Sequence, residues 1–201
     1  MKNSYGILLE KELEKIKADG RRPSLFLHSC CAPCSSYVLE YLTGYFDITL
    51  FYYNPNISPR EEYAFRAEEL SRLCAEMPLE RKPKIVVGEY ENDVFLEKVR
   101  GLENEPEGGA RCTVCYRLRL EKTAQMASSG GFDYFTTTLS ISPYKDAERL
   151  NSIGRALSDI YGVAYLFSDF KKKNGYKRSC ELSQQYRLYR QNYCGCEFSK
   201  K

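Results

Sequence analysis

Five of the nine cysteines fall into two short segments whose spacing suits metal binding. Cys30, Cys31 and Cys34 directly follow an apolar run, and Cys112 and Cys115 open a predicted helix. Residues three apart share a helix face, and a helix N-terminus favours thiolate over thiol. Stable disulfides are rare in reducing compartments, so clustered thiols there indicate metal or redox chemistry. Together the two segments predict a four-thiolate site for either an iron–sulfur cluster or zinc.

The other four cysteines have different spacings. Cys194 and Cys196 flank one glycine beyond the last predicted helix, where we expect no core to need two small apolar side chains. Two such sulfurs can close a strained disulfide, which is the labile, redox-active kind. The alternative is a mobile tail with inert thiols. Cys74 lies on an apolar helix face and is predicted to belong to the core, and Cys180 begins a basic helix and has no assigned role.

Composition narrows the classes of protein that need to be considered. The chain has 201 residues, a net charge of +3 and a single histidine, His28, so a site of several histidines is excluded. The length and an apolar content of 43% predict one folded domain over 1–201. No apolar stretch is long enough to cross a bilayer, and residues 1–6 lack the apolar centre of a signal peptide. We expect a cytoplasmic protein with no membrane partner.

Basic and tyrosine residues are interleaved in the segment 171–201, which we expect to contain a C-terminal helix and the Cys-Gly-Cys tail. The basic residues are Lys171, Lys172, Lys173, Lys177, Arg178, Arg187, Arg190, Lys200 and Lys201; the tyrosines are Tyr176, Tyr186, Tyr189 and Tyr193. Such a segment can bind phosphates and stack on bases. It fits a solvated helix with a tyrosine core face equally well.

Strands and helices are predicted to alternate along the chain. Strands are expected at 24–28, 46–53, 84–88, 134–138 and 164–167, and helices at 8–17, 36–42, 59–76, 92–100, 112–128, 146–161 and 179–192. This alternation predicts an α/β fold, with a mostly parallel sheet covered by helices on both faces in a Rossmann-like layout. Sites in such sheets form at the carboxyl ends of the strands. The loops after His28, Tyr53, Thr138 and Phe167 are therefore the informative ones.

Several of these stretches resemble the QueH-type epoxyqueuosine reductases, which do not use cobalamin. The matching stretches are LHSCCAPCS (27–35), FYYNPNI (51–57), RCTVCYRLR (111–119), TTTLSISPYK (136–145) and YCGC (193–196). The resemblance covers about 22–198. The layout is also similar to the nucleotide α-hydrolase fold of ATP-dependent tRNA thiolases. Cysteines here replace the phosphate-binding loop of those enzymes, which argues against ATP use.

The resemblance implies an activity, a substrate and a cofactor. It implies reduction of epoxyqueuosine at the tRNA wobble position to queuosine, so tRNA carrying that nucleoside is the implied partner. The implied ligands of a 4Fe-4S cluster are Cys30, Cys31, Cys112 and Cys115. The implied redox-active pair is Cys194 and Cys196.

Deoxygenation of an epoxide to an alkene consumes two electrons and two protons and releases water. A dithiol supplies two electrons and a cluster passes one at a time, so we expect the cluster to relay electrons and the cysteine pair to be an electron reservoir or exchange point. The electron donor is not identified by the sequence. Cys34 is left over and is a candidate ligand of an adjacent mononuclear iron. The leaving oxygen needs a proton donor or a Lewis acid. The candidate donors are His28, Tyr144, Lys145 and Asp146, and for His28 we favour a supporting role.

Three other functions fit parts of the same pattern. A zinc-stabilised tRNA-binding module would use the four thiolates without catalysis. A thiol–disulfide oxidoreductase would act through Cys194 and Cys196 alone. An ATP-using tRNA thiolase would share the fold, and the missing phosphate loop disfavours it.

Overall fold

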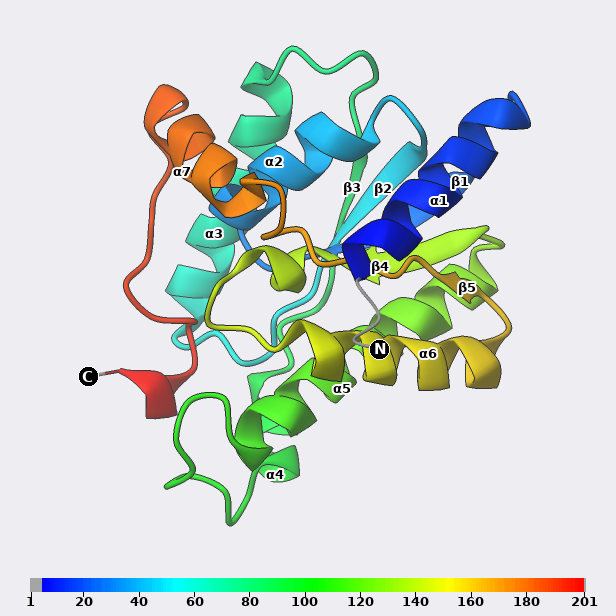
Figure 1. Cartoon of the computed structure of the whole chain (residues 1–201). Coiled ribbons are helices and arrows are strands. Elements are labelled where there is room, and N and C mark those ends of the chain that lie inside the picture. Colours follow the sequence, from blue (N-terminus) through cyan, green and yellow to red (C-terminus); the bar gives the residue numbers. More distant parts are fainter. Residues whose placement is uncertain (1–4, 201) are drawn as a thin grey trace.

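A five-stranded, all-parallel sheet with the order β3-β2-β1-β4-β5 forms the centre of the computed structural model, which describes residues 5–200 (Figure 1). The strands are β1 (Ser24–Ser29), β2 (Asp47–Tyr52), β3 (Lys84–Val87), β4 (Tyr134–Thr137) and β5 (Ala164–Tyr165). Parallel neighbours require crossover connections, and helices supply them. The predicted α/β, Rossmann-like fold is confirmed.

Helices cover both faces of the sheet (Figure 1). They are α1 (Tyr5–Ala18), α2 (Ala32–Leu42), α3 (Arg60–Glu76), α4 (Asn92–Lys98), α5 (Ala110–Ser129), α6 (Ala147–Tyr161) and α7 (Gly175–Gln185), with short 3-10 helices η1 (Thr138–Ile141) and η2 (Glu197–Ser199). Successive β1 side chains alternate between two apolar clusters, because a strand points neighbouring residues to opposite faces. Leu25 and Leu27 pack with residues of α1, α2 and α3, whereas Phe26 packs with residues of α5 and α6. Cys74 lies in the first cluster, which confirms its predicted place in the core.

The chain ends of β1 and β4 meet at the point where the strand order changes direction. From β1 the order runs one way to β2 and β3 and the other way to β4 and β5. Loops that leave such a switch point diverge and open a crevice at the carboxyl ends of the strands. The Cys30 amide donates to Thr138 Oγ1 across this point at 3.2 Å. The first cysteine segment therefore lies at the place where sheets of this kind bind ligands.

The C-terminal helix ends earlier than the sequence predicts. The expected range was 179–192, but α7 ends at Gln185 and Arg187 takes a positive φ of 48°. Arg72 of α3 donates to the Tyr186 carbonyl oxygen at 3.2 Å, so a tertiary contact satisfies a group that a continuing helix would use. The chain then runs without regular structure to η2. This connecting segment brings Cys194 back over the carboxyl ends of the strands.

Three smaller differences also have local causes. The helix after β1 starts at Ala32 instead of 36, because Pro33 suits its first turn. The predicted strand 134–138 ends at Thr137, whose side chain accepts from the Leu139 amide and begins η1. The predicted strand 164–167 pairs over only two residues. Residues 1–4 of the segment 1–6, and Lys201, lie outside the described range.

Candidate metal and redox site

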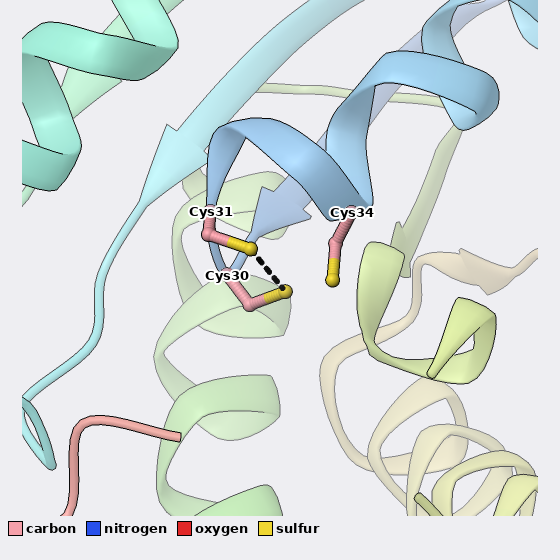
Figure 2. A group of neighbouring side chains, drawn as sticks. All are labelled: Cys30, Cys31 and Cys34. Carbon is pink, nitrogen blue, oxygen red and sulfur yellow. Dashed lines mark hydrogen bonds between the residues drawn. The ribbon is translucent and has the colours of Figure 1, made fainter. Parts of the chain in front are cut away.

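Three sulfurs converge where β1 ends and α2 begins (Figure 2). Cys30 follows β1, Cys31 is the N-cap of α2, and Cys34 lies in its first turn. Their sulfurs all lie within 4.8 Å of one another, and those of Cys30 and Cys31 are 3.9 Å apart. Ser35 Oγ donates to the Cys31 carbonyl at 2.9 Å and fixes the turn. We call Cys30, Cys31 and Cys34 the thiol trio; this group of ligand atoms can bind a metal ion.

Hydrogen bonds within the thiol trio distribute its protons unequally. Bonds donated by the Cys30 and Cys34 thiols lower the pKa of Cys31 well below its usual value. The bond with Cys31 raises the pKa of Cys30, and bonds with Cys30 and then Cys31 raise the pKa of Cys34. The trio therefore favours one thiolate that is held by two thiols. A soft cation can replace those two protons, because thiolates are the ligands that it prefers.

Cys112 and Cys115 lie one turn apart near the start of α5, and both are buried. The Gly108 amide donates to Cys112 Sγ at 3.2 Å, and this approach uses a backbone φ of 89° that suits glycine. Cys115 packs in a small apolar cluster with Phe95 and Cys196. Neither α5 cysteine belongs to the group of sulfurs that lie within 4.8 Å of one another. The two cysteine segments therefore do not form one single-ion site, and a ligand set drawn from both suits a group larger than one ion, such as a cluster of several irons.

Arg119, one turn beyond Cys115 on α5, is buried among the cysteine segments. Its Nη1 lies 3.9 Å from Cys115 Sγ, and its Nη2 donates to Asn54 Oδ1. Burial lowers the pKa of the guanidinium, but the sulfurs of Cys115, Cys30 and Cys194 outweigh that effect and the net pKa is raised. Thiols from three distant parts of the chain therefore surround one fixed positive charge.

His28 is fully buried and has two hydrogen-bond partners inside the protein. Its Nδ1 lies 2.8 Å from Thr137 Oγ1, and its Nε2 lies 3.0 Å from the Tyr53 carbonyl oxygen. Because the carbonyl can only accept, we assign the proton to Nε2 and let the Thr137 hydroxyl donate to Nδ1. Burial, and then the Arg119 charge, hold the pKa of His28 well below its usual value. A neutral imidazole with both nitrogens engaged suits the supporting role that we expected.

Cys194 and Cys196 are free thiols held against the body of the protein. The Ser58 amide donates to the Gly195 carbonyl at 3.1 Å, and Asn56 Nδ2 donates to the Cys194 carbonyl at 3.3 Å. Cys196 is 6% exposed and packs in an apolar cluster. The expectation that no core needs this cysteine is therefore wrong. The sequence lacks the signal that would show it, because the packing partners lie on α4 and α5.

The two thiols of this pair differ in acidity. A hydrogen bond from Cys196 lowers the pKa of Cys194 strongly, and the nearby Lys145 ammonium and Ser199 hydroxyl act in the same direction. The donated bond raises the pKa of Cys196. Because the thiolate is the more reactive form of a cysteine, Cys194 has the more reactive side chain of the two, and Cys196 retains its proton.

The three consecutive candidates 144–146 have separate surroundings. Tyr144 is 77% exposed. Lys145 is mostly buried and donates to Glu107 Oε1 at 2.9 Å. Burial alone would lower the pKa of Lys145, but the neighbouring Cys194 and Tyr116 raise it. The ammonium therefore stays protonated. Asp146 caps α6 by accepting from the Arg149 amide at 3.1 Å. Of the three, only Lys145 is a buried cation beside a redox cysteine.

A cavity of about 750 Å³ brings these groups together. The thiol trio, Arg119 and Cys194 line it, and Lys145 lies in the same wall. Around it stand aromatic and basic side chains, namely Tyr144, Tyr176, Tyr193, Arg190 and Lys200. Ligand pockets for small molecules usually measure about 300 to 1,000 Å³. The cavity therefore has room for one nucleoside next to the sulfurs.

The basic segment is less free than its sequence suggests. Lys171 pairs with Asp169 and donates to the Ser140 and Lys145 carbonyls, so it supports the loop that carries Lys145. Lys173 pairs with Glu10, and Arg178 pairs with Glu40 and Glu181. Lys172, Lys177, Arg187 and Lys200 are exposed, and none forms an ion pair with another described residue.

Comparison with known proteins decides the family. A family model described as epoxyqueuosine reductase QueH matches residues 25–201. The chain belongs to the QueH family of epoxyqueuosine reductases. The QueH protein of Streptococcus pyogenes serotype M1 is 43% identical over 202 residues, which is 100% of this chain and 79% of that protein.

Other QueH relatives agree over similar lengths. The protein of Staphylococcus epidermidis is 44% identical over 206 residues, covering 99% of this chain and 87% of its own. The protein of Thermotoga maritima is 36% identical over 182 residues, which is 88% of this chain and 90% of that protein. The QueH chain described here is therefore an oxidoreductase, as predicted, and a purely binding zinc module no longer fits. Among residues 5–200, no helix combines the length and the apolar character needed to span a membrane.

Two polar residues of this QueH site were missed by the sequence analysis. Asn54 and Arg119 both lie inside stretches that carry the resemblance, FYYNPNI and RCTVCYRLR. Asn54 Nδ2 donates to the Ser29 carbonyl at 3.0 Å, while its Oδ1 accepts from Arg119. An arginine within a charged helix is usually solvated, so residue type alone did not single out Arg119.

The buried neutral His28 predicts a loss of stability in mild acid. Its pKa in the folded state lies below the unfolded value of about 6.5, so below that pH only the unfolded chain takes up the proton. The free energy of unfolding should fall by about 1 kcal/mol as pH drops from 6.5 to 5.5, and the slope should approach roughly 1.4 kcal/mol per pH unit below that. Since His28 is the only histidine, denaturant unfolding of His28→Gln should lack this slope. Equal slopes in both proteins would contradict the assignment.

Proposed function

We propose that this chain reduces epoxyqueuosine in tRNA to queuosine, using thiolate-bound iron and a dithiol at one cavity. Family membership over residues 25–201 is the observation that carries the reaction. The half-reaction is balanced as epoxide, two electrons and two protons giving alkene and water. Oxidation of a dithiol to a disulfide releases two electrons and two protons, so the two half-reactions match in both. The test is to treat epoxyqueuosine-containing tRNA with the protein, digest the tRNA, and measure whether the mass of the nucleoside falls by one oxygen atom.

Our proposed cluster ligands are Cys30, Cys31, Cys112 and Cys115. Four soft thiolates from two loops at helix starts fit a 4Fe-4S cluster in donor chemistry. Burial of both α5 cysteines shields such a site from water. When bound, the cluster would supply single-electron transfer next to the cavity. Zinc binds the same ligands but undergoes no redox change. Identifying the bound metal therefore distinguishes a zinc site from an iron–sulfur cluster.

Cys34 is the proposed ligand of an adjacent mononuclear iron. Its sulfur lies within 4.8 Å of the Cys30 and Cys31 sulfurs, so the thiol trio is compatible with a ligand shared between the two metals. Iron beside the cavity would act as a Lewis acid toward the epoxide oxygen.

Lys145 is the proposed stabiliser of the leaving oxygen. It keeps its proton because Cys194 and Tyr116 raise its pKa, which makes it an electrostatic partner for developing negative charge. The exposed Tyr144 is better placed to stack on a base at the mouth of the cavity. Asp146 and His28 already have structural partners, and we assign them supporting roles.

The proposed partner at the mouth of the cavity is the anticodon loop of tRNA. Exposed cations and aromatic rings surround the opening, and such surfaces bind single-stranded nucleic acid through phosphate contacts and stacking. A tRNA substrate implies a cytoplasmic enzyme, and we propose that location. An external electron donor must restore the dithiol after each turnover.

The cluster assignment predicts the colour and metal content of the protein. Protein purified without oxygen should be brown and contain about one 4Fe-4S cluster per chain, with acid-labile sulfide. Cys115→Ser should abolish both, because serine is a poor substitute for a soft thiolate. Cys180→Ser, the same change at a cysteine that does not line the cavity, is the matched control and should keep the cluster. Stoichiometric zinc without sulfide in the native protein would contradict the assignment.

Cys34→Ser separates the two proposed metals within this prediction. It should keep the visible spectrum of the cluster and lose some iron and the activity. Loss of the whole cluster would make Cys34 one of its ligands instead.

The redox pair predicts a selective loss of turnover. Cys194→Ser should keep the cluster and tRNA binding, since Cys194 is not among its proposed ligands, but fail to make queuosine repeatedly with a physiological reductant. Native protein that is reduced and then freed of reductant should form more product per chain than the variant, because only it stores the dithiol electrons. Cys180→Ser should behave as native. Normal repeated turnover by Cys194→Ser would show that the tail is a passive cap.

The proposed tRNA surface predicts a change in salt dependence. Replacing Lys172, Lys177 and Lys200 by alanine should weaken tRNA binding and flatten its dependence on salt, by about 0.7 in the logarithmic slope for each lost single-strand phosphate contact. Lys17→Ala, at the other end of the sheet, is the control for loss of a surface charge. Lys171 is left unchanged because it supports the Lys145 loop. An unchanged slope would identify these lysines as solvated residues without a tRNA contact.

A further inference from the structure

Arg119 is a buried cation with no carboxylate partner among residues 5–200. It is 4% exposed, and its one oxygen acceptor is the neutral Asn54 side chain. The other buried arginines have different surroundings. Arg66 pairs with Glu62, and Arg111 donates to the carbonyl oxygens of three loop residues at 2.6 to 3.1 Å. Of these three buried arginines, only Arg119 faces cysteine sulfurs.

A buried charge without a counter-charge is strongly unfavourable, because the surrounding protein replaces water poorly. The groups that can supply negative charge near Arg119 are thiols. Cys115 Sγ is 3.9 Å from Nη1, and the Cys30 and Cys194 sulfurs are close enough to affect the guanidinium. The position of this arginine is therefore explained when those sulfurs are thiolates, as they are when they bind a metal.

We propose that Arg119 is the fixed counter-charge of the cluster site and sets its reduction potential. This inference rests on the cluster proposed above. Each electron that enters the site adds one negative charge to a shielded region, and a neighbouring positive charge stabilises the reduced state more than the oxidised one. N–H groups directed at the ligand sulfurs act in the same direction. Arg119 is a positioning residue, because it acts through the sulfurs and not on the substrate.

The structure holds this charge in one place. Asn54, which accepts from Arg119, itself donates to the Ser29 carbonyl at the end of β1. The Arg119 Nε lies 3.4 Å from the His28 ring, which is fixed by its own two partners. Asn54 therefore ties the guanidinium to the ends of β1 and β2, and the His28 ring packs beside it without accepting a hydrogen bond from Nε, because Nε2 carries its own proton. A rigid charge next to a redox centre is able to tune its potential without reorganising.

The test is a redox titration of the loaded protein with dithionite and mediators, followed by the visible and electron paramagnetic resonance spectra. Arg119→Gln should shift the midpoint potential of the cluster to a more negative value. Arg119→Lys, which keeps the charge and loses the fork of donors, should give a smaller shift. Arg117→Gln removes the same charge from the exposed side of the same helix and should leave the midpoint unchanged.

Iron and sulfide are measured before each titration, so the cofactor and the role of Arg119 are judged separately. A native protein without a cluster would remove the cofactor proposal. A loaded Arg119→Gln protein with the native midpoint would overturn the counter-charge role while leaving the cofactor in place. If Arg119→Gln folds but does not load, Arg119→Lys decides: loading restored by lysine supports the charge role, and continued failure assigns Arg119 to local geometry and overturns it.

Discussion

Negative charge on buried sulfur is the constraint on which the arrangement of this protein depends. The cysteines that line the cavity come from two distant parts of the chain, 30–34 and 194, and the buried Cys112 and Cys115 come from a third segment near Arg119. Thiolates in such a place need nearby positive charge or oriented N–H groups. The protein supplies both, through Arg119, through Lys145 beside Cys194, and through the helix start at Cys31. The parallel sheet makes this possible because the loops at its carboxyl ends meet on one side.

The C-terminal segment completes the site as a fixed part of it. Hydrogen bonds from Ser58 and Asn56 hold the backbone around Gly195, and a side chain on Gly195 would collide with Ile57 at 2.7 Å. Arg111 donates to the Phe198 carbonyl at 3.4 Å on the other side of the pair. These contacts hold Cys194 in the wall of the cavity, where the proposed redox pair would have to act.

The sequence predicts the elements well where apolar runs are continuous, as in β1 and β2, and where cysteines directly follow them. It fails where tertiary contacts decide. The end of α7 depends on Arg72, which lies more than a hundred residues away, and the burial of Cys196 depends on Phe95 of α4. Arg119 looks like any surface arginine of a charged helix until the loops are folded around it. The contacts of Lys171 are hidden for the same reason.

The shape of the site limits how a tRNA can use it. A cavity of about 750 Å³ has room for one nucleoside; buried or half-buried sulfurs line it together with Tyr144, Arg190 and Lys200, which are exposed. The proposed substrate must therefore leave the anticodon stack and enter alone, with its neighbours held outside. Extrusion is least unfavourable for a base that is already unpaired, as a wobble nucleoside is in free tRNA. Buried sulfurs next to exposed aromatic and basic side chains thus match the proposed reaction on one nucleoside of a larger RNA.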